Sequence, residues 1–269
     1  MAIAWQLLGS PLPTVVLHFG LHCVEHVIRR HWNQLSDQQK HFLKVRSLEV
    51  LSLGTYLSGV KLLRESMAKV ISEIAQREWP QRWESLTSEL INLGSSDELH
   101  RHLCVLVLRN IAEVVTAYDP ALPDKRRKAI QIGITAVQTN EILPFCSNVL
   151  DAHVSRYMTQ NNDQDLSLIL DTISLIEAFT EYTPFSSLCE CQLIQGLAGM
   201  LHTQVFCAPV LRVIVQAVNK KTQGIEEKYH PVLVNLWITS IEVTRMVLQT
   251  EVSQPLFLYV PYNTRTKTS

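Results

Sequence analysis

Glycine is scarce in this sequence, and so are the loops that glycine makes possible. The 269 residues include nine glycines, and none belongs to a G-x-x-x-x-G-K-[ST] or G-x-G-x-x-G motif. Backbone N–H groups of such loops cradle phosphates, so the residues point to no ATP or dinucleotide site and no cofactor. The G-x-S-x-G elbow of hydrolases is also missing, although a Ser/His/Asp triad built in another way stays open.

Long apolar runs and an excess of charge are missing as well. No apolar run approaches the ~20 residues of a membrane-spanning helix, so membrane insertion is not expected. With 24 Lys and Arg against 25 Asp and Glu, bulk charge favours neither nucleic acid nor membrane, and any basic site must be local. Residues 1–10 lack a basic start, and Gln6 interrupts their apolar stretch, so secretion is not expected either.

Paired metal-binding or redox cysteines are missing too. None of the six cysteines forms a C-x-x-C pair, and most lie on apolar helical stripes. Cys189 and Cys191 would project about 200° apart around a helix, which makes it difficult for them to bind one ion together. We therefore predict reduced, buried thiols in an intracellular protein.

Helical apolar spacing, by contrast, recurs along almost the whole chain, and no segment alternates with the period of a strand. Ser36 followed by Gln39, and Ser95 followed by Glu98, predict capping boxes at two helix starts. Pro144 predicts a kink or break in a long helical region. The polar residues 159–164 are interpreted as a loop.

Ten predicted helices pair into about five antiparallel hairpins that begin near residues 14, 58, 96, 164 and 204. HEAT and armadillo repeats are about 40–47 residues long, and three of the four intervals are near that length. We therefore predict an all-α, right-handed HEAT-type solenoid, with a compact helical bundle as the alternative. The expected division is an atypical segment over 1–13, the solenoid over 14–250 and a disordered tail over 251–269.

A helical pattern stops at Trp79-Pro80 and restarts at once on Trp83. Proline disrupts a helix interior but fits the first turn of a new helix. Residues 77–83 therefore predict a tight corner between two antiparallel helices, in which Trp79, Pro80 and Trp83 are structural and fill the gap.

Two clusters of residues could carry chemistry. His22, Glu25 and His26 match H-x-x-E-H, a zinc-protease motif, with His18 one turn earlier; a polar helix face is the simpler interpretation. The other cluster is the dense basic run at residues 125–128, where positive charge opposes the dipole of a helix start. This run consists of Lys125, Arg126, Arg127 and Lys128. Three interpretations stay open: a solvated helix start, a nuclear-import signal, and a contact surface for RNA phosphates or an acidic partner.

The corner also supports a family resemblance. Residues 77–83 resemble the E-W-P-x-x-W corner of the exportin-1-like N-terminal region. Residues 18–32 resemble the second helical hairpin of exportins, and residues 109–115 with 125–127 look most like the exportin-5 branch. The similarity covers roughly residues 17–237 and weakens after residue 140.

The resemblance implies a nuclear export receptor of the importin-β (karyopherin) superfamily, which is not an enzyme. Such receptors shuttle between nucleus and cytoplasm, pass nuclear pore proteins and bind the Ran GTPase in its GTP form. Exportin-5-like members carry hairpin or double-stranded RNA such as microRNA precursors, some transfer RNA, and proteins. Their RNA recognition depends on shape and backbone, which suits a curved solenoid.

The sequence also departs from the family. Residues 1–13 do not resemble the first hairpin, and the later repeats do not occur in this sequence. We therefore expect an N-terminal fragment that keeps the fold and binds Ran weakly. The alternative functions are a HEAT-repeat scaffold or adaptor without transport activity, and the zinc enzyme.

Overall fold

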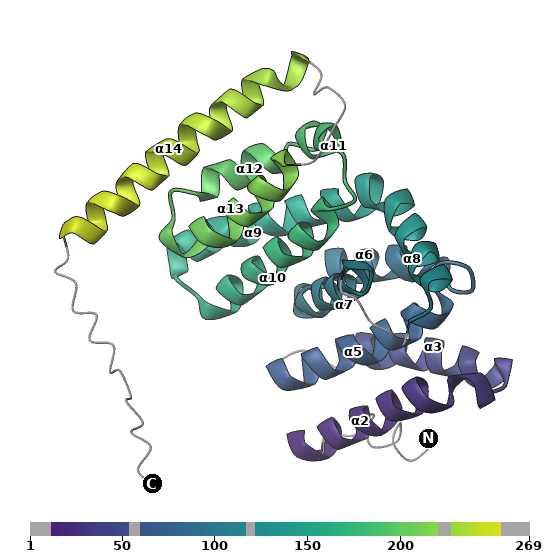
Figure 1. Cartoon of the computed structure of the whole chain (residues 1–269). Coiled ribbons are helices and arrows are strands. Elements are labelled where there is room, and N and C mark those ends of the chain that lie inside the picture. Colours follow the sequence, from purple (N-terminus) through teal and green to yellow (C-terminus); the bar gives the residue numbers. More distant parts are fainter. Residues whose placement is uncertain (1–11, 54–59, 117–121, 220–226, 254–269) are drawn as a thin grey trace, which may run out of the picture.

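The computed structural model describes residues 12–53, 60–116, 122–219 and 227–253, and within these ranges the chain is helical with no strand (Figure 1). Apart from two short 3-10 helices and one π-helix, all elements are α-helices. In chain order they are α2 (Thr14–His31), η1 (Trp32–Gln34, 3-10), α3 (Asp37–Leu53), α5 (Lys61–Glu78), α6 (Leu86–Ser96), α7 (Glu98–Thr116), α8 (Asp124–Val137), η2 (Gln138–Ile142, π), α9 (Leu143–Gln160), α10 (Asp163–Thr180), α11 (Phe185–Glu190), α12 (Leu193–Met200), α13 (Gln204–Val218), η3 (Glu227–Tyr229, 3-10) and α14 (His230–Ser253).

The helices stack in two layers. One layer runs α2, α5, α7, α10, α13, and each of these helices packs against the next (Figure 1). In the second layer α3 covers α5, α6 covers α7, α9 covers α10 and α12 covers α13. Each pair therefore packs mainly against its neighbours, as in a solenoid, and the predicted all-α HEAT-type architecture is confirmed.

The pairing of the helices differs from the sequence prediction by one helix. We expected α5 and α6 to form a hairpin, but α6 packs against α7, while α3 packs against α5. The corner at Trp79-Pro80 therefore connects two successive hairpins instead of closing one. Apolar spacing shows which face of a helix is buried, but it contains no information on which neighbour covers that face.

The first predicted capping box is confirmed and the second is wrong. The Ser36 backbone N–H donates to Gln39 Oε1 at 2.9 Å, and the Gln39 N–H donates to Ser36 Oγ at 3.3 Å. Ser95 instead lies inside α6, which continues to Ser96, and Asp97 precedes α7 with its carboxylate against His100. The helices α6 and α7 are thus separated by a single residue.

Two of the predicted breaks take a specific form. The π-helical turn η2 absorbs the bend before α9, and Pro144 occupies the first turn of α9, where its missing N–H costs nothing. The expected loop over 159–164 is shorter than predicted. Asn161 adopts a left-handed conformation (φ 49°) and the Asn162 side chain accepts from the Gln164 N–H at 2.8 Å, so two residues turn the chain.

The C-terminal helix also differs from expectation. It continues through Ser253, so the first three residues of the predicted tail are helical. Trp237 and Ile241, expected on a buried stripe, are 68% and 49% exposed. Residues 1–11 and 254–269, which hold most of the predicted end segments, lie outside the described residues. None of the described helices is long and apolar enough to cross a membrane.

Candidate functional site

The corner between α5 and α6 is buried. Trp79 is 1% exposed and Trp83 is 7% exposed. Helix α8 crosses the corner at Gly133, where an added Cβ would lie 2.8 Å from the Trp79 ring and 2.9 Å from Pro80. The tryptophans thus lie in the core of the solenoid, and α8 approaches them closely because Gly133 has no side chain.

Glu78, the last residue of α5, holds one side of the corner. Its carboxylate is 3% exposed and accepts from Trp32 Nε1 at 3.2 Å and from Lys44 Nζ at 3.4 Å. Lys44 Nζ also donates to the Arg82 carbonyl at 2.8 Å. These contacts join α3 and η1 to the corner. They also give the Glu78 carboxylate hydrogen-bond partners, without which its burial would be costly.

Arg126 holds the other side of the corner. Its guanidinium donates to the carbonyls of Gln76 (2.5 Å), Ala75 (3.1 Å) and Trp79, and to Gln81 Oε1 (2.5 Å). The last carbonyls of a helix have no partner within the helix and carry partial negative charge. Arg126 therefore caps the C-terminus of α5 from the first turn of α8.

A groove of about 770 Å³ opens beside this corner, where the C-terminal ends of α2 and α5 meet the start of α8. We call it the cationic groove. Six cations and two carboxylates line it, so positive charge is in excess. The cations are Arg29, Arg30, Lys40, Arg77, Arg82 and Arg126, and the carboxylates are Glu73 and Glu78.

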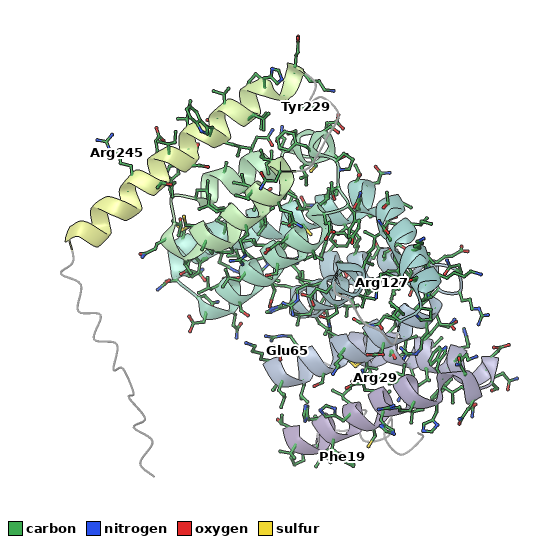
Figure 2. All side chains as sticks on the ribbon, viewed as in Figure 1. Phe19, Arg29, Glu65, Arg127, Tyr229 and Arg245 are labelled. Carbon is green, nitrogen blue, oxygen red and sulfur yellow. The ribbon has the colours of Figure 1, made fainter. Side chains whose placement is uncertain are left out.

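The two carboxylates hold part of this charge in place. Glu73 Oε2 accepts from Arg77 at 2.8 Å and its Oε1 lies 3.5 Å from Arg29 Nε, where α2 faces α5 (Figure 2). Arg30 and Arg82 are exposed, and within the described part of the chain Arg30 forms no ion pair. The groove thus has a fixed interior and outward guanidinium groups that can bind an anion.

The members of the predicted basic cluster at residues 125–128 do not line a single surface. Arg126 is half-buried and lines the cationic groove. Lys125 and Lys128 are exposed and line a different hollow, between the corner and α8. Arg127 is half-buried. Arg126 is therefore engaged in structural contacts, and the two lysines remain accessible.

Most of the cationic groove is not visible in the sequence. Its cations are spread from residue 29 to residue 126, and only the packing of α2, α5 and α8 brings them together. One local signal existed, because Arg29, Arg30 and Arg77 all occupy the last turns of helices. That placement also suits the helix dipole, so it could not be distinguished from ordinary helix stabilisation.

Comparison with known proteins settles the family. A family model described as exportin 1-like protein matches residues 60–214, more than half of the chain. The chain belongs to the exportin 1-like family. The match contains the whole corner and Arg126, whereas Arg29, Arg30 and Lys40 of the cationic groove precede it. The resemblance inferred from the corner is thereby confirmed.

Among curated relatives, the chain is 28% identical over 219 residues to exportin-5 of Mus musculus, an alignment that covers 77% of this chain and 18% of that protein. It is 26% identical over 219 residues to exportin-5 of Homo sapiens, with the same coverage. It is 27% identical over 190 residues to HASTY 1 of Arabidopsis thaliana, which covers 68% and 16%. The chain therefore spans less than a fifth of the length of these relatives.

The H-x-x-E-H residues of this exportin 1-like chain do not form a metal site, although His22 Nδ1 lies 3.4 Å from Glu25 Oε2. Glu25 is buried and binds Lys69 Nζ at 3.0 Å and Arg29 at 3.4 Å; burial alone would raise the pKa of Glu25, but these cations lower it. His22 Nε2 contacts His18 Nε2 at 3.1 Å. In the described ranges no three His, Cys, Asp or Glu side chains are placed to hold a metal ion. The motif forms a polar helix face, the simpler of the two interpretations.

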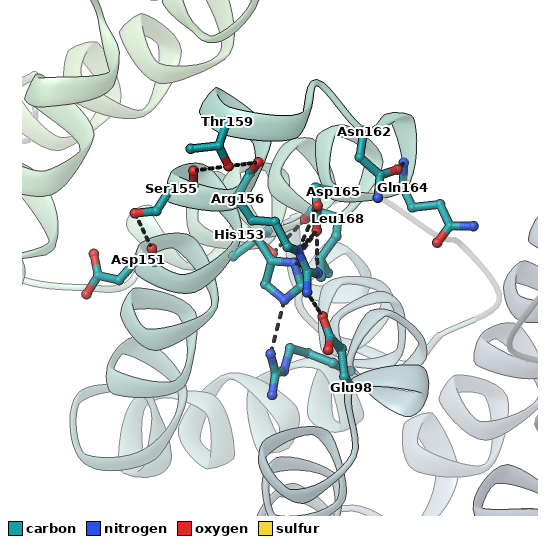
Figure 3. Close-up of polar contacts among 12 residues, drawn as sticks. Glu98, Asp151, His153, Ser155, Arg156, Thr159, Asn162, Gln164, Asp165 and Leu168 are labelled. Atoms are coloured by element: carbon teal, nitrogen blue, oxygen red, sulfur yellow. Dashed lines mark hydrogen bonds and ion pairs between the residues drawn. The ribbon is translucent and has the colours of Figure 1, made fainter.

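A second polar cluster, not predicted from the sequence, joins α7, α9 and α10 of the solenoid. In Figure 3 His153, Arg156 and Asp165 point toward one another. His153 Nδ1 lies 2.6 Å from Asp165 Oδ1, and Arg101 donates to His153 Nε2 at 3.0 Å. A guanidinium only donates, so Nε2 accepts from Arg101, and a neutral ring with Nδ1–H directed at Asp165 fits this contact. Arg156 Nη2 lies 2.8 Å from the same Nδ1 and also pairs with Asp165. Burial lowers the pKa of His153. Burial alone would raise the pKa of Asp165, but the hydrogen bonds from Arg156 and His153 outweigh it and lower that pKa.

The cysteines of the described part are free thiols, as predicted. Cys104, Cys146 and Cys189 are buried, and the other three are half-buried. Burial raises the pKa of Cys104 to about 12 and of Cys189 to about 11. Such thiols stay protonated at neutral pH and are poor nucleophiles.

Proposed function

We propose that this chain takes part in nuclear export, within a receptor that binds structured RNA such as microRNA precursors as cargo and the Ran GTPase in its GTP form. Protein cargo, transfer RNA and nuclear pore proteins complete the expected set of partners. Membership of the exportin 1-like family supports the export role, and the names of the similar exportin-5 proteins support the branch. We expect the protein to shuttle between nucleus and cytoplasm.

The cationic groove is the observation that carries the RNA part of the proposal. Its six cations face two carboxylates, and both carboxylates are already engaged by Arg and Lys side chains. An added phosphate would therefore meet uncompensated positive charge. Double-stranded RNA is recognised largely through its phosphates and its A-form shape, which requires backbone-directed cations and no base-reading groove.

Binding of an RNA hairpin across a salt series tests this proposal. We expect the double variant Arg30→Gln/Arg82→Gln to bind more weakly, and the slope of log K against log salt to fall in magnitude by about two, because each lost phosphate contact removes about one released counterion. Both side chains are exposed. Arg82 lies 3.8 Å from Glu78 Oε1, but Glu78 keeps Trp32 and Lys44 as partners, so the melting temperature should change little.

The matched control removes two equally exposed cations elsewhere. Lys61→Gln/Arg212→Gln has the same net charge as the test variant, but Lys61 is at the start of α5 and Arg212 on α13. If both double variants lose the same affinity and salt slope, RNA responds only to net charge and the groove is not the contact.

Association with Ran distinguishes a transport receptor from the scaffold alternative. Stronger binding to Ran-GTP than to Ran-GDP, measured with the same preparation, supports the export proposal. Equal binding to the two nucleotide states contradicts Ran-dependent transport and favours the scaffold.

A further inference from the structure

A second hollow, of about 510 Å³, lies between the corner and α8 on a surface that the proposed RNA function does not use. We call it the apolar hollow. Trp79, Pro80, Gly133 and Val137 line it, and α8 supplies Ala129 and Ala136 along its length. Because α8 carries small residues here, its backbone lies close to the corner and leaves a shallow apolar trough.

Ile132 stands beside this trough with 70% of its surface exposed. A neighbouring hollow of about 520 Å³ shares Lys128, Ile132 and Ala136 with the first, so Ile132 forms a ridge between the two. A single exposed apolar residue is ordinary on a protein surface. An exposed isoleucine between two adjoining apolar hollows is a surface that a partner can cover.

The rim of the apolar hollow is cationic. Lys125 and Lys128 are exposed, three residues apart on one face of α8, and in the described part of the chain neither forms an ion pair. Glu84 is the one carboxylate that lines the hollow. Both lysines lie in the first two turns of α8, where the helix dipole adds to their positive charge. Carboxylates of a partner are therefore favoured at this rim.

We propose that the apolar hollow docks a short segment of a partner protein in which one bulky apolar side chain is followed by carboxylates. The apolar side chain covers the trough between Pro80 and Ile132, and the carboxylates reach Lys125 and Lys128. Single-stranded RNA fits this surface less well, because its bases need an exposed ring to stack on and Trp79 is 1% exposed. Double-stranded RNA needs only cations, and the RNA arm of the experiment below distinguishes it.

Fluorescence anisotropy with the peptide Gly-Ser-Leu-Phe-Asp-Glu-Gly-Ser, labelled with fluorescein, tests the proposal on the whole chain. We expect saturable binding with a Kd below about 1 mM, since one buried apolar side chain and two exposed ion pairs contribute modestly. Replacing Leu-Phe by Ser-Ser, or Asp-Glu by Asn-Gln, should each weaken binding. The variant Ile132→Ser should weaken it about five-fold or more, while Val215→Ser, an exposed apolar residue on α13, should not.

A second variant tests how much the two rim lysines contribute to peptide binding. Lys125→Gln/Lys128→Gln should weaken the peptide and remove most of its salt dependence, and Lys61→Gln/Arg212→Gln is again the matched control. The proposal is overturned if the peptide does not saturate, or if binding is insensitive to Ile132→Ser. It is also overturned if the lysine double variant weakens binding of the Ser-Ser peptide, which keeps Asp-Glu, or of an RNA hairpin as much as it weakens binding of the Leu-Phe-Asp-Glu peptide. The site would then bind anions in general. RNA binding that depends on Arg30 and Arg82 is measured separately, so either proposal can fail alone.

Discussion

Replacing Gly133 by alanine should destabilise the protein, although the same change usually stabilises a helix. Glycine inside a helix costs about 0.5–1 kcal/mol relative to alanine. At Gly133, however, the new Cβ would lie 2.8 and 2.9 Å from Trp79 ring carbons and 2.9 Å from Pro80 Cγ. Carbon atoms pack at about 3.5–4.0 Å, so α8 or the corner must move.

The neighbouring atoms cannot yield easily. The indole of Trp79 is 1% exposed, and the Arg126 guanidinium holds the Trp79 carbonyl. Overpacking of this kind costs about 1–3 kcal/mol. After the helix-propensity gain is subtracted, we expect Gly133→Ala to lower the free energy of unfolding by about 1 kcal/mol, and by at most about 2.5 kcal/mol. For a chain of this size, a loss of about 1 kcal/mol lowers the melting temperature by about 2–4 °C.

Gly196 provides the matched control, because it is also a helix-interior glycine and no atom lies within 4 Å of its added Cβ. Gly196→Ala should raise the free energy of unfolding by about 0.5–1 kcal/mol. Urea denaturation of the two variants, followed by circular dichroism, measures both values. A Gly133→Ala protein that is as stable as Gly196→Ala would refute the close approach of α8 to the corner.

Two further predictions concern the polar contacts of the solenoid. Arg126→Met should lower the free energy of unfolding by about 2–3 kcal/mol in urea denaturation, because it leaves the last carbonyls of α5 without their partner. As a control, Lys128→Met at an exposed position should change it by less than about 0.5 kcal/mol. Equal effects of the two variants would show that the capping contacts contribute nothing. Burial lowers the pKa of His153 in the folded protein below its unfolded value of about 6.5. Below about pH 6.5 the unfolded chain therefore binds a proton that the folded chain does not bind. The stability is full above that pH and is lost as the pH falls from there through the folded pKa. His153→Gln should reduce this acid-side slope by up to about 1.4 kcal/mol per pH unit in urea denaturations between pH 7 and 5, and an unchanged slope would mean that His153 is protonated in the folded state.

Local features of the fold could be predicted from sequence because each depends on residues within a few positions of one another. The Ser36 capping box needs only Ser36 and Gln39, and the irregular helical turn before α9 was indicated by Pro144 alone. The capping box predicted at Ser95 is wrong because that prediction, too, used only neighbouring residues. Its residues match the pattern, but α6 continues through Ser96 and packs against α7. A local pattern cannot register a competing tertiary contact.

The candidate site was predictable only in part. The basic cluster was visible as a run of charge, but the roles of its members depend on the direction in which each side chain leaves α8. Arg126 turns to the carbonyls of α5, whereas Lys125 and Lys128 face solvent beside the apolar hollow. Residues one or two positions apart on a helix lie on different faces, so a run of four cations cannot form a single surface.

The sequence by itself determined that this protein is a helical repeat and marked its family at the Trp79-Pro80 corner, because apolar period, proline position and tryptophan spacing are all local. Only the tertiary structure decided that the corner connects two hairpins, that Glu78 and Arg126 hold it from two sides, and that cations from Arg29 to Arg126 form one groove. These features join residues tens of positions apart. Their contacts follow from how whole helices pack, and no short stretch of sequence encodes that packing.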